Sequence, residues 1–157
     1  MTITTAEEFD RDWDWFAVDA AGAIGHFVTA GLRPLPKTIR ANREAALRLI
    51  DYFDREAPKG GPYVVRAEVE RDCGGWNTEA ARRRYLESYV EMASAGLYSY
   101  DTYTSVSKTD YFLVAFPVHP LKVGQLPAEI RTLICRLELP GVFSTTPYLS
   151  EQDTLDR

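Results

Sequence analysis

The chain has 157 residues, of which 45% are hydrophobic and 26% are charged, values that argue against extensive disorder and fit one globular domain over residues 1–157. The formal charge of −5 disfavours a nucleic-acid binder, which usually presents a basic face. No apolar run approaches the ~18 residues of a membrane span and no secretory signal is visible, so we expect a cytoplasmic protein without membrane contact.

The negative charge is concentrated in an acidic N-terminal segment, residues 1–19. It holds six carboxylates against one arginine, whereas residues 20–157 hold 17 acids and 17 bases. Aromatic side chains among carboxylates suit contact with a protein partner that has a basic surface. The residues expected at that contact are Asp10, Asp12, Trp13, Asp14 and Trp15. A strand that buries the indoles and exposes the carboxylates would have the same sequence, so a structural role of the rings is the alternative.

The first half of the chain predicts a short helix over 5–10, capped by Thr5, and then a β-hairpin. The hairpin strands cover 15–18 and 24–29, and Asp19 and Gly22 favour the turn between them. Apolar residues at three- and four-residue spacing predict a long helix over 37–57. Residues 63–70 are compatible with a strand or a short helix, and we favour a strand or an extended connector.

The second half predicts a long helix from residue 77 or 78 to 95, strands over 97–103 and 111–118 joined by a loop at 105–110, and a short helix over 127–136. A last strand is expected over 142–145, and the polar end 150–157 is expected to fray. This order predicts an α+β fold, with two long helices and one short helix packed on a mainly antiparallel sheet of about five strands.

Cys73 and two histidines are the candidates for catalysis. Cys73 precedes a predicted helix start next to Arg71, which can favour a thiolate, and His26 or His119 could act as its base. The alternative is that Cys73 is a turn residue and His26 a partly buried strand residue. Cys135 is expected in the core, and both cysteines are expected to be free thiols.

No metal site and no cofactor are expected, because the two histidines are far apart and no Cys-x-x-Cys, Walker A or dinucleotide-binding pattern occurs. The run 82–84 is all arginine, but it fans around a helix among glutamates, which favours a solvated face over nucleic-acid binding. Tyr98 and Tyr100 share one face of a predicted strand. They are either core residues or part of a recognition surface, for which a homodimer interface is one possibility.

The run 15–27, Trp-Phe-Ala-Val-Asp-Ala-Ala-Gly-Ala-Ile-Gly-His-Phe, resembles a hairpin found in many small, poorly characterised bacterial proteins. Some of these resemble immunity proteins of polymorphic toxin systems. The resemblance implies a non-enzymatic cytoplasmic protein that binds and blocks a cognate toxin, with the acidic N-terminal segment facing a basic surface. A small enzyme that uses Cys73 with a histidine, and a structural homo-oligomeric domain, are the alternatives.

Overall fold

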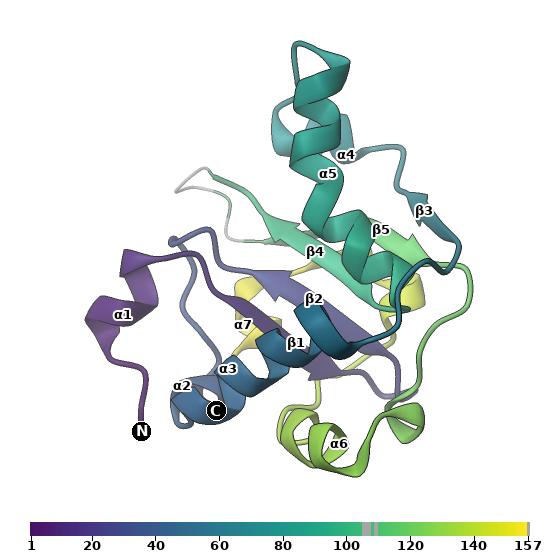
Figure 1. The fold of residues 1–157 in the computed structure, drawn as a ribbon. Helices are drawn as coiled ribbons and strands as arrows, with labels where there is room; N and C mark the ends of the chain where they lie inside the picture. Colours follow the sequence, from purple (N-terminus) through teal and green to yellow (C-terminus); the bar gives the residue numbers. More distant parts are fainter. Residues whose placement is uncertain (105–107, 109, 157) are drawn as a thin grey trace.

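The computed structural model describes residues 1–104, 108 and 110–156, and its centre is a six-stranded mixed sheet (Figure 1). The strands are β1 (Asp14–Val18), β2 (Ile24–Val28), β3 (Tyr63–Val65), β4 (Tyr98–Thr102), β5 (Tyr111–Pro117) and β6 (Tyr148–Leu149). Their order is β1-β2-β4-β5-β3, and β6 also pairs with β5. All pairs are antiparallel except β2 with β4. The predicted α+β fold with a mainly antiparallel sheet is confirmed, while the predicted loop at 105–110 lies largely outside the described residues.

The N-terminal helix α1 (Thr5–Asp10) and the hairpin β1–β2 agree with the prediction. Thr4 caps α1, one residue before the predicted cap, and forms a capping box with Glu7. In the hairpin turn, the Asp19 carboxylate accepts two backbone hydrogen bonds and Gly22 has a φ of 79°. Local side-chain chemistry therefore forms both features.

The prediction of one helix over 37–57 is wrong. The segment is divided into α2 (Lys37–Arg40), α3 (Arg43–Asp51) and the π-helical turn η1 (Tyr52–Glu56). The division occurs at Asn42, whose backbone is extended and whose side chain accepts a hydrogen bond from the Ala45 N–H. Asn42 therefore starts a new helix as its N-cap. The apolar spacing continues across this break, which is why the pattern indicated one helix.

Helices α4 (Val69–Cys73) and α5 (Glu79–Ser94) pack over β3, β4 and β5 (Figure 1). α5 agrees with the predicted second long helix, and the Thr78 hydroxyl caps it by accepting the Ala81 N–H. In the ambiguous segment 63–70, the favoured strand is present as β3 and α4 begins near its end.

After β5 the chain forms the turn η2 (Val123–Gln125) and α6 (Ala128–Ile134), which confirms the predicted short helix. Ile130 and Ile134 face the core. Cys135 follows as the C-cap and is exposed, so its predicted core position is wrong. Both cysteines are free thiols.

The prediction of a strand over 142–145 is wrong, because the segment forms the 3₁₀ turn η3 (Phe143–Thr145). The Asp19 carboxylate accepts the Phe143 N–H at 2.8 Å, and the Phe143 ring is buried, so a distant side chain holds this turn in place. The polar end, which we expected to fray, contains the short helix α7 (Glu151–Thr154) with Thr154 buried.

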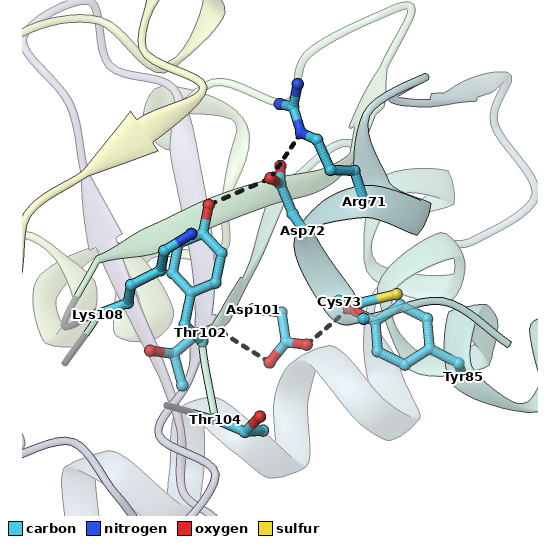
Figure 2. A pocket seen from close by; sticks show the side chains of 10 residues that line it. Arg71, Asp72, Cys73, Tyr85, Asp101, Thr102, Thr104 and Lys108 are labelled. Carbon is cyan, nitrogen blue, oxygen red and sulfur yellow. Dashed lines mark hydrogen bonds and ion pairs between the residues drawn. The ribbon is translucent and has the colours of Figure 1, made fainter. Parts of the chain in front are cut away.

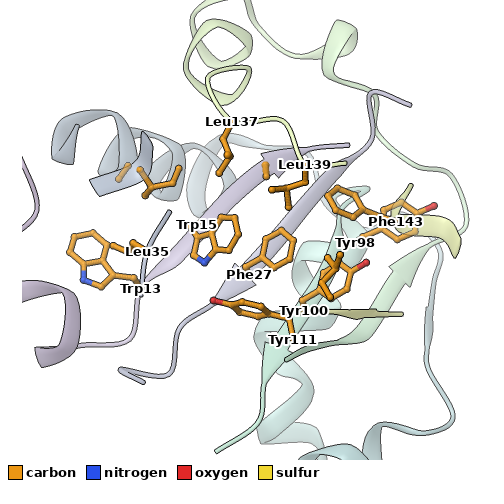
Figure 3. Close-up of a cluster of buried hydrophobic side chains, with 14 of the residues drawn as sticks. Trp13, Trp15, Phe27, Leu35, Tyr98, Tyr100, Tyr111, Leu137, Leu139 and Phe143 are labelled. Atoms are coloured by element: carbon orange, nitrogen blue, oxygen red, sulfur yellow. The ribbon is translucent and has the colours of Figure 1, made fainter. Parts of the chain in front are cut away.

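Aromatic rings form much of the core on the side of the sheet away from α5 (Figure 3). The centroids of Trp15 and Phe27 are 4.2 Å apart in a stacked pair, and Phe27 stacks on Tyr100 at 4.8 Å. Segments from both ends of the chain cover these rings, including Ile3 and Leu139. No helix in the described part of the chain combines the length and the apolar character of a membrane span.

Candidate functional site

The aromatic side chains of the predicted contact surface lie in the core. Trp13 and Trp15 are 0% and 1% exposed, and Tyr98 and Tyr100 are 5% and 0% exposed. All four rings belong to one buried cluster, because alternate residues of a strand face the same side of a sheet. This corrects the expectation that they contact a partner.

The carboxylates of the acidic N-terminal segment have different environments. Glu7 and Glu8 form ion pairs with Arg43 and Arg40, at 3.1 and 3.4 Å. Asp19 is buried and accepts hydrogen bonds from backbone N–H groups of the hairpin turn and of η3. Among the described residues, no lysine or arginine pairs with the three aspartates of the predicted contact, Asp10, Asp12 and Asp14.

Asp12 and Asp14 belong to a larger group, which we call the aspartate cluster: Asp12, Asp14, Asp54 and Asp101. Within the described residues, none of these carboxylates forms a salt bridge with a lysine or arginine, although the charge of Lys59 is close enough to Asp54 to favour its ionised form. Lys59 donates to the backbone carbonyl of Asp54 and not to its carboxylate. The members come from the loop before β1, from β1, from η1 and from β4, and each lies close enough to His26 to interact with it electrostatically.

Burial and the repulsion of neighbouring carboxylates raise pKa values at three members of the aspartate cluster, Asp12, Asp54 and Asp101. Burial is the main cause of the raised pKa of Asp12, and the charges of Asp14 and Asp101 add to it. Burial and the Asp14 charge also raise the pKa of Asp54, and burial raises the pKa of Asp101. These shifts show that burial outweighs the favourable contacts of the three carboxylates with His26, Lys59 and their hydrogen-bond donors, and raised carboxylate pKa values are frequent at functional sites.

His26 adjoins the cluster and is fully buried. Its Nδ1 is 2.7 Å from Ser99 Oγ, and its Nε2 is 3.3 Å from Asp14 Oδ2. The second contact lacks hydrogen-bond geometry, so Nε2 is a buried nitrogen with no hydrogen-bond partner in the described part of the chain. The set Ser99, His26 and Asp14 has the composition of a catalytic triad, but Ser99 is fully buried and a substrate cannot reach its hydroxyl.

Asp101 connects the aspartate cluster to a pocket of about 490 Å³ (Figure 2). Tyr85 of α5 donates a 2.6 Å hydrogen bond to Asp101 Oδ2. The pocket is otherwise lined by residues from α4 and from the end of β4, together with Lys108. One carboxylate of the cluster is therefore accessible from this pocket.

Cys73 lines the same pocket but lacks the environment of a nucleophile (Figure 2). Burial raises the pKa of its thiol, and the negative charges of Asp101 and Glu70 raise it further. Its Sγ is 3.7 Å from the Glu70 carbonyl oxygen, and no histidine contacts it among the residues described. The structure therefore does not form the predicted dyad of Cys73 with His26 or His119.

The aspartate cluster suits a large cation better than a metal ion. In residues 1–104, 108 and 110–156, no three His, Cys, Asp or Glu side chains are arranged to hold a metal. Calcium would need several oxygens that converge at about 2.3–2.6 Å. A guanidinium or ammonium group carries several N–H donors and can reach carboxylates that are further apart.

No family model, no curated protein and no solved structure matches the chain. Sequence reasoning found Asp12, Asp14 and His26 but missed Asp54 and Asp101. Asp54 is one of several charged residues near the end of a helical segment, and nothing local distinguishes it. Asp101 did carry a signal, because a carboxylate in the middle of an aromatic strand is seldom placed there for packing.

Proposed function

We propose that this chain is a non-enzymatic binding protein that accepts a positively charged side chain of a protein partner at the aspartate cluster. The observation that carries the proposal is that, among the described residues, four aspartates that all interact electrostatically with His26 form no salt bridge with a lysine or arginine. The buried Nε2 of His26 lies 3.3 Å from Asp14 Oδ2 but has no hydrogen bond among the described residues, which is a second sign of an incomplete polar site.

Other carboxylates of the chain show that arginine pairing is common in this fold. Arg48 alone lies within ion-pair distance of Asp51, Glu56 and Glu129. A cation that entered the aspartate cluster would lower the raised pKa values of Asp12, Asp54 and Asp101, because an opposite charge favours the ionised carboxylate. The raised pKa values therefore favour binding of a cation.

A toxin with a basic surface would be one partner of this kind, in line with the resemblance of the hairpin 15–27 to immunity-type proteins. In this proposal the aspartates make the contact, whereas Trp13 and Trp15 hold the strand that carries Asp14 in place. Acidic patches accelerate association with cationic partners, and salt weakens the effect over a Debye length of about 10 Å at 0.1 M.

The test uses two triple variants with the same formal charge. The cluster variant is Asp12→Asn, Asp14→Asn and Asp54→Asn, and the control is Glu70→Gln, Glu87→Gln and Glu138→Gln. Each changes the charge from −5 to −2. The control glutamates are exposed and have no ion pair among the described residues, so the control removes charge without touching the cluster.

Binding is measured by fluorescence anisotropy with a labelled hexa-arginine peptide, and by co-purification with the product of an adjacent gene, at low and at physiological salt. We expect the cluster variant to lose at least ~10-fold in peptide affinity and the control to lose less than ~3-fold. Equal losses in the two variants would show attraction by net charge alone and would overturn the proposal. Circular dichroism confirms that both variants are folded.

A further inference from the structure

Strands β3 and β6 together form one edge of the sheet. The hydrogen bond that joins them connects Arg66 and Tyr148, which are 82 residues apart in the sequence. Both pair antiparallel with β5 on the side that β4 does not occupy. β3 covers residues 115–117 of β5 and β6 covers residues 111–112. We call this pair of strands the composite edge.

Arg66 closes the joint between the two strands. Its backbone N–H bonds the Val114 carbonyl at 2.9 Å, and its Nε donates to the Leu113 carbonyl at 2.6 Å. Its Nη1 donates to the Tyr148 hydroxyl at 3.0 Å, and the guanidinium lies 4.8 Å from the centre of the Tyr148 ring. The composite edge is therefore continuous along β5.

The outward backbone groups of this edge have no partner in the described part of the chain. The N–H and C=O of one strand residue point to the same side, and residues alternate. Pro62 and Pro147 accept hydrogen bonds from Val118 and Leu113 of β5 and its extension, so both prolines face inward. The outward groups then belong to Tyr63, Val65 and Tyr148, each of which has an N–H to donate.

Natural edges are usually protected by charged side chains, by outward-facing proline or by a covering segment. The five residues of the composite edge carry no charge, and Tyr63, Val64 and Tyr148 are 44%, 42% and 39% exposed. The opposite edge differs, because Val18 of β1 exchanges backbone hydrogen bonds with Leu137 and Leu139. The end of β1 is therefore covered at the opposite edge, whereas the composite edge is open in the described part of the chain.

We propose that the composite edge pairs with the composite edge of a second copy of this chain, so that two sheets join across a two-fold axis at the Arg66 joint. Such an axis places β3 of each copy opposite β6 of the other, in antiparallel orientation, and aligns aromatic with β-branched residues. The exposed charges beside the joint are of opposite sign, Arg71 and Glu68, so each copy offers the other a complementary pair. This inference does not depend on the proposed function.

Analytical ultracentrifugation of the full chain over a dilution series tests the pairing. We expect a mass that rises with concentration from 17.7 kDa toward twice that value. Val64→Lys should raise the dissociation constant of the dimer by at least ~10-fold, because a charge on the edge opposes pairing. Leu32→Lys is the matched control, since Leu32 is 45% exposed and lies outside the edge, and it should change the constant by less than ~2-fold.

Hydrogen exchange identifies the surface that pairs. The amides of Tyr63, Val65 and Tyr148 should become protected as the concentration rises, because they would then donate to the second copy. A chain that stays at 17.7 kDa up to about 1 mM would overturn the proposal, and the composite edge would then be open to a foreign strand only. A dimer that survives Val64→Lys unchanged, or that leaves these amides unprotected, would overturn it as well.

Discussion

Asp72 and Asp101 line the same pocket, but their pKa values are shifted in opposite directions (Figure 2). Asp72 is bound by Arg66 and by the hydroxyl of Tyr148. Burial alone would raise the pKa of Asp72, but these partners outweigh burial and lower it. Among the described residues, the hydrogen-bond donors to Asp101 are neutral groups, the Tyr85 hydroxyl and the Thr102 N–H, and burial raises the pKa of Asp101.

The two aspartates represent two kinds of carboxylate, one that stabilises the folded state and one that does not. A buried carboxylate with a guanidinium partner is satisfied within the chain, and its loss would leave a buried positive charge. A carboxylate with a raised pKa destabilises the folded state at neutral pH. Asp12, Asp54 and Asp101 of the aspartate cluster are of the second kind, which favours a role in binding over a role in folding.

The largest expected effect comes from Asp72→Ala. The Arg66 side chain is only 10% exposed, so the variant leaves a mostly buried guanidinium without its main carboxylate partner. We expect a loss of about 3 kcal/mol in the free energy of unfolding, measured by urea denaturation. The control is Asp153→Asn, an exposed aspartate in α7. A loss below about 1 kcal/mol for Asp72→Ala would show that Arg66 is satisfied by its other acceptors.

In the aspartate cluster we expect substitution to increase the free energy of unfolding. Asp12→Asn with Asp54→Asn removes two charges whose pKa values are raised, and the amide oxygen introduced at position 12 can still accept the Ala30 N–H. We expect the double variant to gain up to about 1 kcal/mol in the free energy of unfolding at pH 7. A clear loss of stability would mean that these carboxylates make stabilising contacts within the fold.

The free energy of unfolding should depend on pH in opposite ways for Asp72 and for the pair Asp12 and Asp54. For Asp12 and Asp54 the folded pKa lies above the ordinary value of 3.8, so the wild type loses stability as pH rises through the window above 3.8. The advantage of the double variant should therefore shrink as pH falls to 3.8 and below. For Asp72 the folded pKa lies below 3.8, so its contribution is present above 3.8 and is lost as pH falls through the lowered value. Urea titrations from about pH 3 to about pH 8 measure both trends.

The smallest effect is expected at Cys73, which lines the same pocket as Asp72 and Asp101. Because the pKa of the thiol is raised, alkylation by iodoacetamide should be slow at about pH 7 and should accelerate above about pH 9. Cys73→Ser should change the free energy of unfolding by no more than about 0.5 kcal/mol and should leave binding of the hexa-arginine peptide unchanged. Rapid alkylation at neutral pH would instead indicate an activated thiol and would favour the enzymatic alternative.

The sequence by itself determined the local features of this protein. The start of α5 at residue 77 or 78, the turn at Asp19 and Gly22, and the class of the fold follow from short-range patterns, and the structure then selects Thr78 as the cap. The same patterns failed at Asn42, where an extended backbone interrupts an apolar spacing that continues on both sides.

Only the tertiary structure decided which side chains meet. His26 contacts Ser99 across 73 residues, and Asp54 and Asp101 join Asp14 from η1 and β4. Parallel pairing of β2 with β4 brings His26 beside Ser99, and no local signal specifies that pairing. The physical reason is that burial and mutual repulsion depend on distance in space, whereas a sequence pattern records only distance along the chain.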